Sequence, residues 1–224
     1  MKIILAIGGS VIKTAYDEIK ELAEKKMFDV LIHNGASLFH DFQRSTEKLK
    51  SHSLDLGEIL EDYKRLEKAS KLVWVWLREE YTPVGSLTNI CQNRGIPVLM
   101  FTALGCDFWH LFDNDWERIA RRCWFDFKKL EAYIWRDEFH FISMGSAVIH
   151  PEVFTKALAR IKPKKFRADV VDFLDMYRPR TRVAKYGDYF CLSHKEYLDM
   201  WLANKKPPKK GGEKNDKRRD SCSN

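Results

Sequence analysis

The chain has 224 residues, of which 13% are aromatic, and a formal net charge of +7. This length and aromatic content are typical of one globular domain with a sizeable core, and they exclude a disordered chain. The charge is uneven, because residues 204–224 carry eight Lys/Arg and three Asp/Glu while the rest is near neutral. We therefore expect a single domain over 1–203 and a basic, disordered tail over 204–224. Such a tail is more often a solvated segment than a nucleic-acid contact, so nucleic acid is not favoured as a partner.

The five cysteines are odd in number and form no CxxC pair. This usage favours reduced thiols in a cytoplasmic protein, and it offers no paired ligand spacing for a metal site. The apolar run at 2–7 is followed at once by Gly-Gly-Ser, which favours a buried strand over a signal peptide. No apolar segment has the length of a membrane span, so we expect no membrane partner.

Apolar runs of strand length alternate along the chain with segments whose apolar residues recur at helical spacing. The runs predict buried strands at 2–7, 28–33, 95–104, 138–144 and 168–176. The helical spacing predicts helices at 11–27, 54–80, 115–135, 151–161 and 194–203, with Pro151 at the first position of its helix. This alternation predicts an α/β fold, a doubly wound, mostly parallel, Rossmann-like sheet.

Glycine turns follow four of the predicted strands, in the stretches AIGGSVIK, IHNGASLFHD, TALGCDFWH and SMGSAVIHPE. In open α/β sheets, ligands bind in the crevice beyond the carboxyl ends of the strands. Glycine lets a ligand approach the backbone closely, and the N-terminus of a following helix attracts phosphate. Neither GxGxxG nor GxxxxGK[ST] occurs, so the ordinary dinucleotide and P-loop fingerprints are absent. Four turns meeting at one edge of the sheet nevertheless predict a binding crevice.

Titratable side chains lie just past these strand ends, namely His40, His110 and His150, with Asp41 and Asp107. An imidazole there can act as an acid or a base, and a carboxylate can bind a ribose hydroxyl or an ammonium group. The alternative is structural, because a histidine is commonly hydrogen-bonded within a fold and an acid commonly caps a helix.

Longer stretches carry a resemblance over about residues 5–200. They are GGSVIKT, NGASLFHDF, IPVLMFTALGCDFWH, MGSAVIHPEVFTKAL, DFLDMYRPRTRV and YFCLSH. In this order they resemble the deoxyhypusine synthase family, most closely its bacterial deoxyhypusine synthase-like branch. The resemblance implies a Rossmann-like domain that binds NAD at the subunit interfaces of a homotetramer. In deoxyhypusine synthase, NAD takes a hydride from spermidine, and the aminobutyl fragment passes through an enzyme lysine to a lysine of the translation factor 5A precursor.

The resemblance, together with the chemistry of residues near the strand ends, gives three groups of candidate residues. The cofactor group is Asn34, Gly35, Ala36, Gly105, Asp107, Gly145 and Ser146, with Asp107 near the acid that holds the cofactor ribose. The catalytic group is His40, His150 and, as a lysine in a matched segment, Lys185. The substrate group is Asp41, His110, Asp172, Arg178, Arg180, Arg182 and His194.

The chain is a divergent match to the family, with a poor match from Leu49 to Tyr81, and two departures bear on the activity. It has no Trp-Gly-Lys stretch, which carries the imine-forming lysine there, and DMYRPRTRV replaces an Asp-rich polyamine-binding stretch. Arginines attract phosphate or carboxylate and repel a polyammonium substrate. We therefore expect an NAD-dependent transferase or hydride-transfer enzyme that acts on an amine or an anionic small molecule, and not deoxyhypusine formation itself. Two alternatives stay open: a non-catalytic nucleotide-binding or assembly protein on the same fold, and a nucleic-acid-associated protein acting through its tail.

Overall fold

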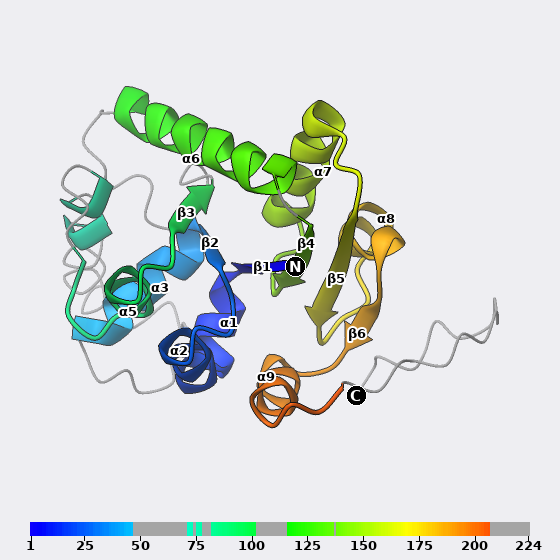
Figure 1. Cartoon of the computed structure of the whole chain (residues 1–224). Helices are drawn as coiled ribbons and strands as arrows, with labels where there is room; N and C mark the ends of the chain where they lie inside the picture. The colour runs from blue at the N-terminus through cyan, green and yellow to red at the C-terminus, as the bar shows by residue number, and fades with distance from the viewer. Residues whose placement is uncertain (47–70, 74, 78–81, 102–115, 137, 207–224) are drawn as a thin grey trace, which may run out of the picture.

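The computed structural model describes residues 1–46, 71–73, 75–77, 82–101, 116–136 and 138–206 (Figure 1). The strands are β1 (Lys2–Ile7), β2 (Val30–Asn34), β3 (Val98–Phe101), β4 (Phe139–Met144), β5 (Phe166–Asp172) and β6 (Tyr189–Cys191). The helices are α1 (Gly9–Thr14), α2 (Tyr16–Glu24), α3 (Gly35–Thr46), α5 (Leu87–Asn93), α6 (Trp116–Arg136), α7 (Ile149–Ile161), α8 (Tyr177–Arg182) and α9 (His194–Leu202), with a 3-10 turn, η2 (Ala184–Tyr186). Within these ranges no helix combines the length and the apolar character needed to cross a membrane.

The strands form one six-stranded sheet in the order β3-β2-β1-β4-β5-β6, and every neighbouring pair is parallel. This is the doubly wound Rossmann order, in which the direction of winding reverses between β1 and β4. The predicted fold class is therefore confirmed. The reversal matters for function because it places the ends of β1 and β4 side by side with helices leaving toward opposite faces.

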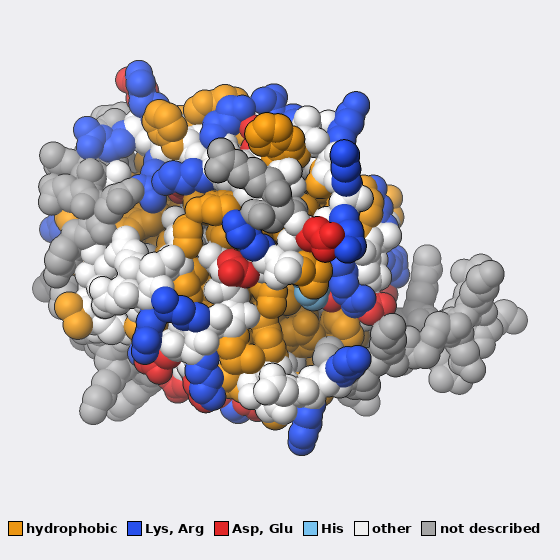
Figure 2. Space-filling model, viewed as in Figure 1, with side chains coloured by type: hydrophobic (Ala, Val, Ile, Leu, Met, Phe, Trp, Pro, Cys, Tyr) orange, Lys and Arg blue, Asp and Glu red, His pale blue; other side chains and the backbone are white. Residues whose placement is uncertain are grey.

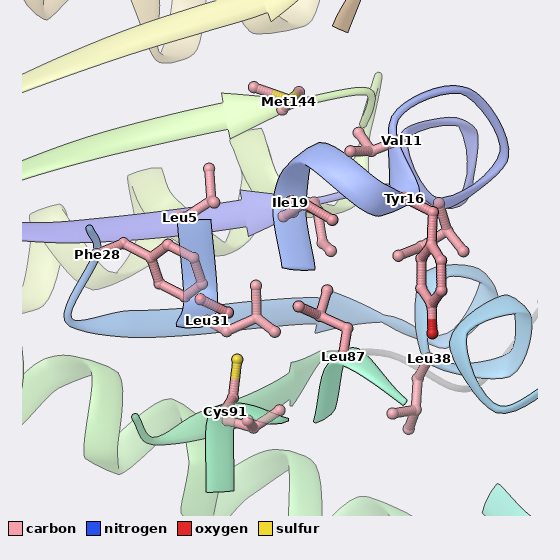
Figure 3. Packing of buried hydrophobic residues seen from close by; sticks show 14 of the residues in the cluster. Leu5, Val11, Tyr16, Ile19, Phe28, Leu31, Leu38, Leu87, Cys91 and Met144 are labelled. Carbon is pink, nitrogen blue, oxygen red and sulfur yellow. The ribbon is translucent and has the colours of Figure 1, made fainter. Parts of the chain in front are cut away.

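Both faces of the sheet are buried, which explains why its strands are continuous apolar runs. Along β1, Leu5 and Ile7 face one apolar cluster, while Ile4 and Ala6 face the other, as the two-residue period of a strand requires. The first cluster lies under α1, α2, α3, α5, α9 and the first half of α6, and the second under α7 and the rest of α6 (Figure 1). In the first cluster, Leu31 of the sheet packs with helical residues that include Ile19 (Figure 3).

Several predicted elements have different bounds in the structure. The helix predicted at 11–27 is two helices, because Ala15 leaves the helical conformation at φ −149° and ψ 41°. Pro151 is the third residue of α7 and not its first. The last predicted strand begins and ends earlier, at Phe166–Asp172, and α3, α5, α8 and β6 were not predicted. Most of the helix predicted at 54–80, and the end of the strand predicted at 95–104, lie outside the described residues.

Candidate functional site

The turns that follow β1 and β4 touch each other at the point where the winding reverses. Gly8 donates a backbone hydrogen bond to the carbonyl of Met144, at 2.8 Å. A Cβ atom on Gly8 would overlap the carbonyl oxygen of Gly145, and one on Gly145, whose φ is +63°, would overlap the hydroxyl of Ser10. Both glycines are therefore required for the two turns to pack backbone against backbone. The hydroxyl of Ser10 donates to the Gly145 carbonyl at 3.3 Å and joins the turns.

The predicted cofactor turn at 34–36 is the start of α3, which follows β2 directly. The amide of Ser37 donates to Asn34 Oδ1 at 2.8 Å, and the amide of Asn34 donates to Ser37 Oγ at 3.0 Å. This reciprocal pair caps the helix. A Cβ atom on Gly9 would lie 3.2 Å from both Ala36 Cβ and His40 Cδ2. The structure thus brings Ala36 and His40 against the turn that follows β1, although their proposed roles stay predictions.

Two buried histidines complete this edge of the sheet. His150, at the second position of α7, is 1% exposed, and neither of its ring nitrogens has a hydrogen-bond partner among the described residues. His194, at the start of α9, is also 1% exposed and would lie 3.2 Å from a Cβ atom on Gly145. Its Nδ1 lies 3.1 Å from the hydroxyl of Thr14, and its Nε2 is buried without a partner in the described structure.

Burial governs the ionisation of these rings. It lowers the pKa of His150 from 6.5 to about 3 and that of His194 to about 4. Both imidazoles are therefore neutral at pH 7, and each can donate one hydrogen bond and accept another. A general base is most effective when its pKa lies near the working pH, so a ring with so low a pKa is better suited to orienting a ligand. An anion bound beside it would raise its pKa.

Asp41 does not line the crevice with His40. It is fully buried, and its carboxylate accepts hydrogen bonds from the Tyr16 hydroxyl at 2.8 Å, the Leu87 amide at 2.7 Å, and the Thr88 amide and hydroxyl at 2.9 and 2.7 Å. Burial raises the pKa of Asp41, and the hydrogen bonds oppose that shift by favouring the carboxylate. The carboxylate thus caps the first turn of α5. Its predicted role as a substrate-binding acid is not supported by this placement.

His33 extends the same buried network toward the crevice. Its Nε2 lies 3.3 Å from the hydroxyl of Thr88 and its Nδ1 lies 2.9 Å from the hydroxyl of Ser37. Burial, with a smaller contribution from His150, lowers the pKa of His33 to about 3. These contacts link β2, α3 and α5, so His33 has a structural role.

The predicted arginine group divides in the structure. Arg178 and Arg182 line one pocket with Ala147 and Val148, next to the predicted cofactor residues Gly145 and Ser146. Ser146 itself is 6% exposed, and its hydroxyl accepts a hydrogen bond from the His150 amide at 3.3 Å.

The third arginine and the nearby acid have other surroundings. Arg180 forms an ion pair with Asp175, with 2.8 Å between its guanidinium nitrogen and the carboxylate. Asp172 ends β5 and is 3% exposed, and burial raises its pKa while backbone hydrogen bonds from Phe173 and Leu174 oppose the shift. The Asp172 carboxylate therefore binds backbone amides of the two residues that directly follow β5.

Lys185 lies away from the other candidates. It is exposed, and its ammonium group lies 4.6 Å from the centre of the Tyr186 ring. That ring contacts Phe166, the first residue of β5, with 4.9 Å between ring centres. Lys185 is therefore at the amino edge of the sheet, opposite the crevice. Gly105, Asp107 and His110 lie outside the described residues.

The structure also adds residues that the sequence did not single out. Ser10 and Thr14 connect α1 to Gly145 and His194, and Glu152 lies between two arginines. Ser10 could have been found from its place in the Gly-Gly-Ser turn after a buried strand. The contacts of Thr14 and Glu152 depend on segments distant in sequence and carry no local signal.

Comparison with solved structures finds this fold at low sequence identity. A structure of AgrE in a ternary complex with ornithine and NAD+ has a TM-score of 0.61 and 12% identity, covering 90% of this chain and 30% of that one. A putative LOR/SDH protein from Methanococcus maripaludis S2 has a TM-score of 0.61 and 11% identity, and the match covers 90% of this chain and 60% of that protein. A putative deoxyhypusine synthase from Entamoeba histolytica has a TM-score of 0.54 and 10% identity, and the match covers 91% of this chain and 74% of that protein.

These likenesses show the Rossmann-like fold. The chain spans less than a third of the length of the AgrE structure. No protein-family model matches the sequence. No curated protein matches it either.

Proposed function

We propose that the protein binds a nicotinamide dinucleotide of the NAD class in the crevice beyond β1 and β4, and that it uses this cofactor on a small amine or anionic molecule. The observation that carries the proposal is the buried His150 ring, whose two nitrogens have no partner in the described structure at the place where Rossmann sheets bind ligands. A buried polar group is normally hydrogen-bonded, so this ring fits a bound ligand.

The fit is different in detail from the ordinary dinucleotide cradle. The carbonyl of Gly145 already occupies the space that the glycine turn after β1 would offer to a pyrophosphate. The start of α3 is the better phosphate site, because it is a helix of 12 residues whose first turn lies against Gly9 at Ala36, although Asn34 already accepts from its Ser37 amide. Gly35 and Ala36 would contact the phosphates there, and His150 and His194 would orient the remainder of the ligand. A bound nicotinamide would supply hydride transfer.

The proposal does not include deoxyhypusine formation, because Lys185 lies at the opposite edge of the sheet. It does include association into a homo-oligomer in the cytoplasm, which the family resemblance favours and light scattering on the purified chain would test. A protein that binds the nucleotide without turnover is the alternative, and the buried, neutral histidines are equally compatible with it.

Calorimetric titration of the purified chain with NAD+ tests the proposal. We expect binding that His150→Leu weakens at least about tenfold, since a hydrogen bond to a buried partner is lost. Lys185→Gln is the matched control, and it should bind as the unaltered chain does. No binding up to millimolar NAD+, or equal loss in both variants, would reject the crevice as the cofactor site. Change in nicotinamide absorbance with candidate amines and anionic substrates would then separate an enzyme from a non-catalytic binder.

A further inference from the structure

A pocket of about 470 Å³ opens beside the crevice, between the turns that follow the neighbouring strands β4 and β5. Its lining comes from both turns and from α8: Ala147, Val148, Met176, Tyr177, Arg178 and Arg182. The volume lies within the range of small-molecule sites, and the lining combines apolar groups with two guanidinium groups.

The charges around this pocket are unbalanced. Among the described residues, Glu152 is the only acid within ion-pair distance of Arg178 and Arg182, and the distances are long, at 3.8 and 3.4 Å. Lys156 is also 3.2 Å from that carboxylate. One negative charge is thus shared among three cations. The group as a whole carries an excess of two positive charges.

The two arginines also keep unused hydrogen-bonding capacity. A guanidinium has five N–H donors in a planar fork, and a single contact at such a distance satisfies little of it. Arg180, in the same short helix, is different because its contact with Asp175 is 2.8 Å long. Figure 2 shows Lys and Arg side chains gathered along the edge of the molecule where α7 and β5 lie. That field would draw an anion toward this edge.

We propose that the pocket binds the anionic end of a small organic molecule, with Arg178 and Arg182 clamping a phosphate or carboxylate group. The excess of two charges favours a dianion, and planar guanidinium forks match its oxygens. Val148 and Met176 would contact the apolar part of the ligand. A polyamine is excluded as the ligand here because its ammonium groups would meet two cations.

If the protein has the proposed function, the clamp identifies its substrate as an anionic molecule. Anion binding by the clamp does not depend on that function, whereas the reaction at the other end of the ligand does. Ala147 and Val148 belong to the same turn as Gly145, and His150 follows them directly. A molecule held by the clamp would therefore extend along this turn toward the cofactor crevice.

Titration of the full chain with inorganic phosphate, without nucleotide, tests the clamp. We expect saturable binding that Arg178→Gln and Arg182→Gln each weaken at least about tenfold, since each removes a charge-assisted contact. Arg180→Gln is the matched control, because it removes the same charge from the same helix outside the pocket, and it should change affinity less than about twofold. Acetate should bind more weakly than phosphate, and tighter binding of acetate would assign the clamp to a carboxylate. All three arginines are about half exposed, so thermal unfolding should show each variant folded.

Absence of phosphate and acetate binding would overturn the clamp, and so would equal losses in the three arginine variants. Titration of the same variants with NAD+ separates this inference from the proposed function. The arginine variants should retain NAD+ binding, while His150→Leu should retain phosphate binding. If phosphate binding is instead lost in His150→Leu and kept in Arg182→Gln, the anion occupies the cofactor site and the clamp is refuted.

Discussion

The substitution Asp41→Asn distinguishes a structural carboxylate from a ligand-binding one. Each of the two oxygens of the Asp41 carboxylate accepts two hydrogen bonds, one from a side-chain hydroxyl and one from a backbone amide. An asparagine oxygen can keep one such pair, and its NH2 group can donate to the hydroxyl of the other pair. The remaining amide, of Leu87 or Thr88, is then left buried without an acceptor in either orientation.

The cost follows from these changes. An unsatisfied buried donor costs about 1–3 kcal/mol, and each of the remaining hydrogen bonds loses about 1 kcal/mol when its acceptor loses the charge. We therefore expect Asp41→Asn to lower the free energy of unfolding by about 3–6 kcal/mol, a large part of the 5–15 kcal/mol typical of a domain. Thr88→Val is the matched control. It removes one of the four hydrogen bonds to Asp41, together with the contact between the same hydroxyl and His33 Nε2, and should cost about 2–4 kcal/mol.

Urea unfolding at pH 7 measures the loss of unfolding free energy in both variants, provided that the dependence of that free energy on urea concentration is the same as in the unaltered chain. A loss below about 1 kcal/mol in Asp41→Asn, together with lost NAD+ or phosphate binding, would refute the structural assignment. The carboxylate would then be a ligand group, as the sequence alone suggested.

The contact between the two glycine turns gives a second prediction. Gly8→Ala should destabilise the protein by about 3 kcal/mol or more, because the added Cβ would overlap the backbone of Gly145. Gly9→Ala should cost only about 1 kcal/mol, because its Cβ would lie 3.2 Å from the side chains of Ala36 and His40. Thermal unfolding of the pair would contradict this if the two losses were equal. His150→Leu, measured without ligand by urea unfolding, should be neutral or stabilising by up to about 3 kcal/mol, because it removes unpaired buried nitrogens at similar volume; clear destabilisation would mean that the ring has a structural partner. The pKa values of about 3 for His33 and His150 and about 4 for His194 lie below the unfolded value of 6.5, so their contribution to stability is complete above pH 6.5 and is lost as the pH falls toward 3. Unfolding free energies measured between pH 7 and pH 4 should therefore decline, and a flat profile in that range would count against neutral buried rings.

The parallel sheet could be predicted from sequence because its strands are buried on both faces and appear as continuous apolar runs. β6 has three residues, too few for any periodicity, and α8 has six residues with Pro179 inside it. The break at Ala15 had no signal, since neither glycine nor proline marks it. Short elements of this kind are positioned by tertiary contacts, which no local pattern records.

The crevice could be predicted for the same reason as the sheet, since parallel strands bring their carboxyl ends to one edge. The directions of individual side chains could not. His40 and Asp41 are consecutive in α3, so they point about 100° apart around the helix and cannot both face one crevice. His40 lies against Gly9, while Asp41 points toward α5. Likewise, Arg178 and Arg182 meet Glu152 only because α7 and α8 pack together.

The capping of α5 by a residue of α3 has a consequence for how the chain can vary. Asp41 holds Leu87 and Thr88, and the rings of Phe42 and Trp76 meet at 6.5 Å between centres. The chain on both sides of residues 47–70 is therefore fixed in one core, whatever lies between. Doubling the length of a connection between fixed ends costs only about 0.6 kcal/mol in closure entropy. Relatives could thus gain or lose residues in this stretch, or carry an inserted module there, while the sheet and its crevice stay unchanged.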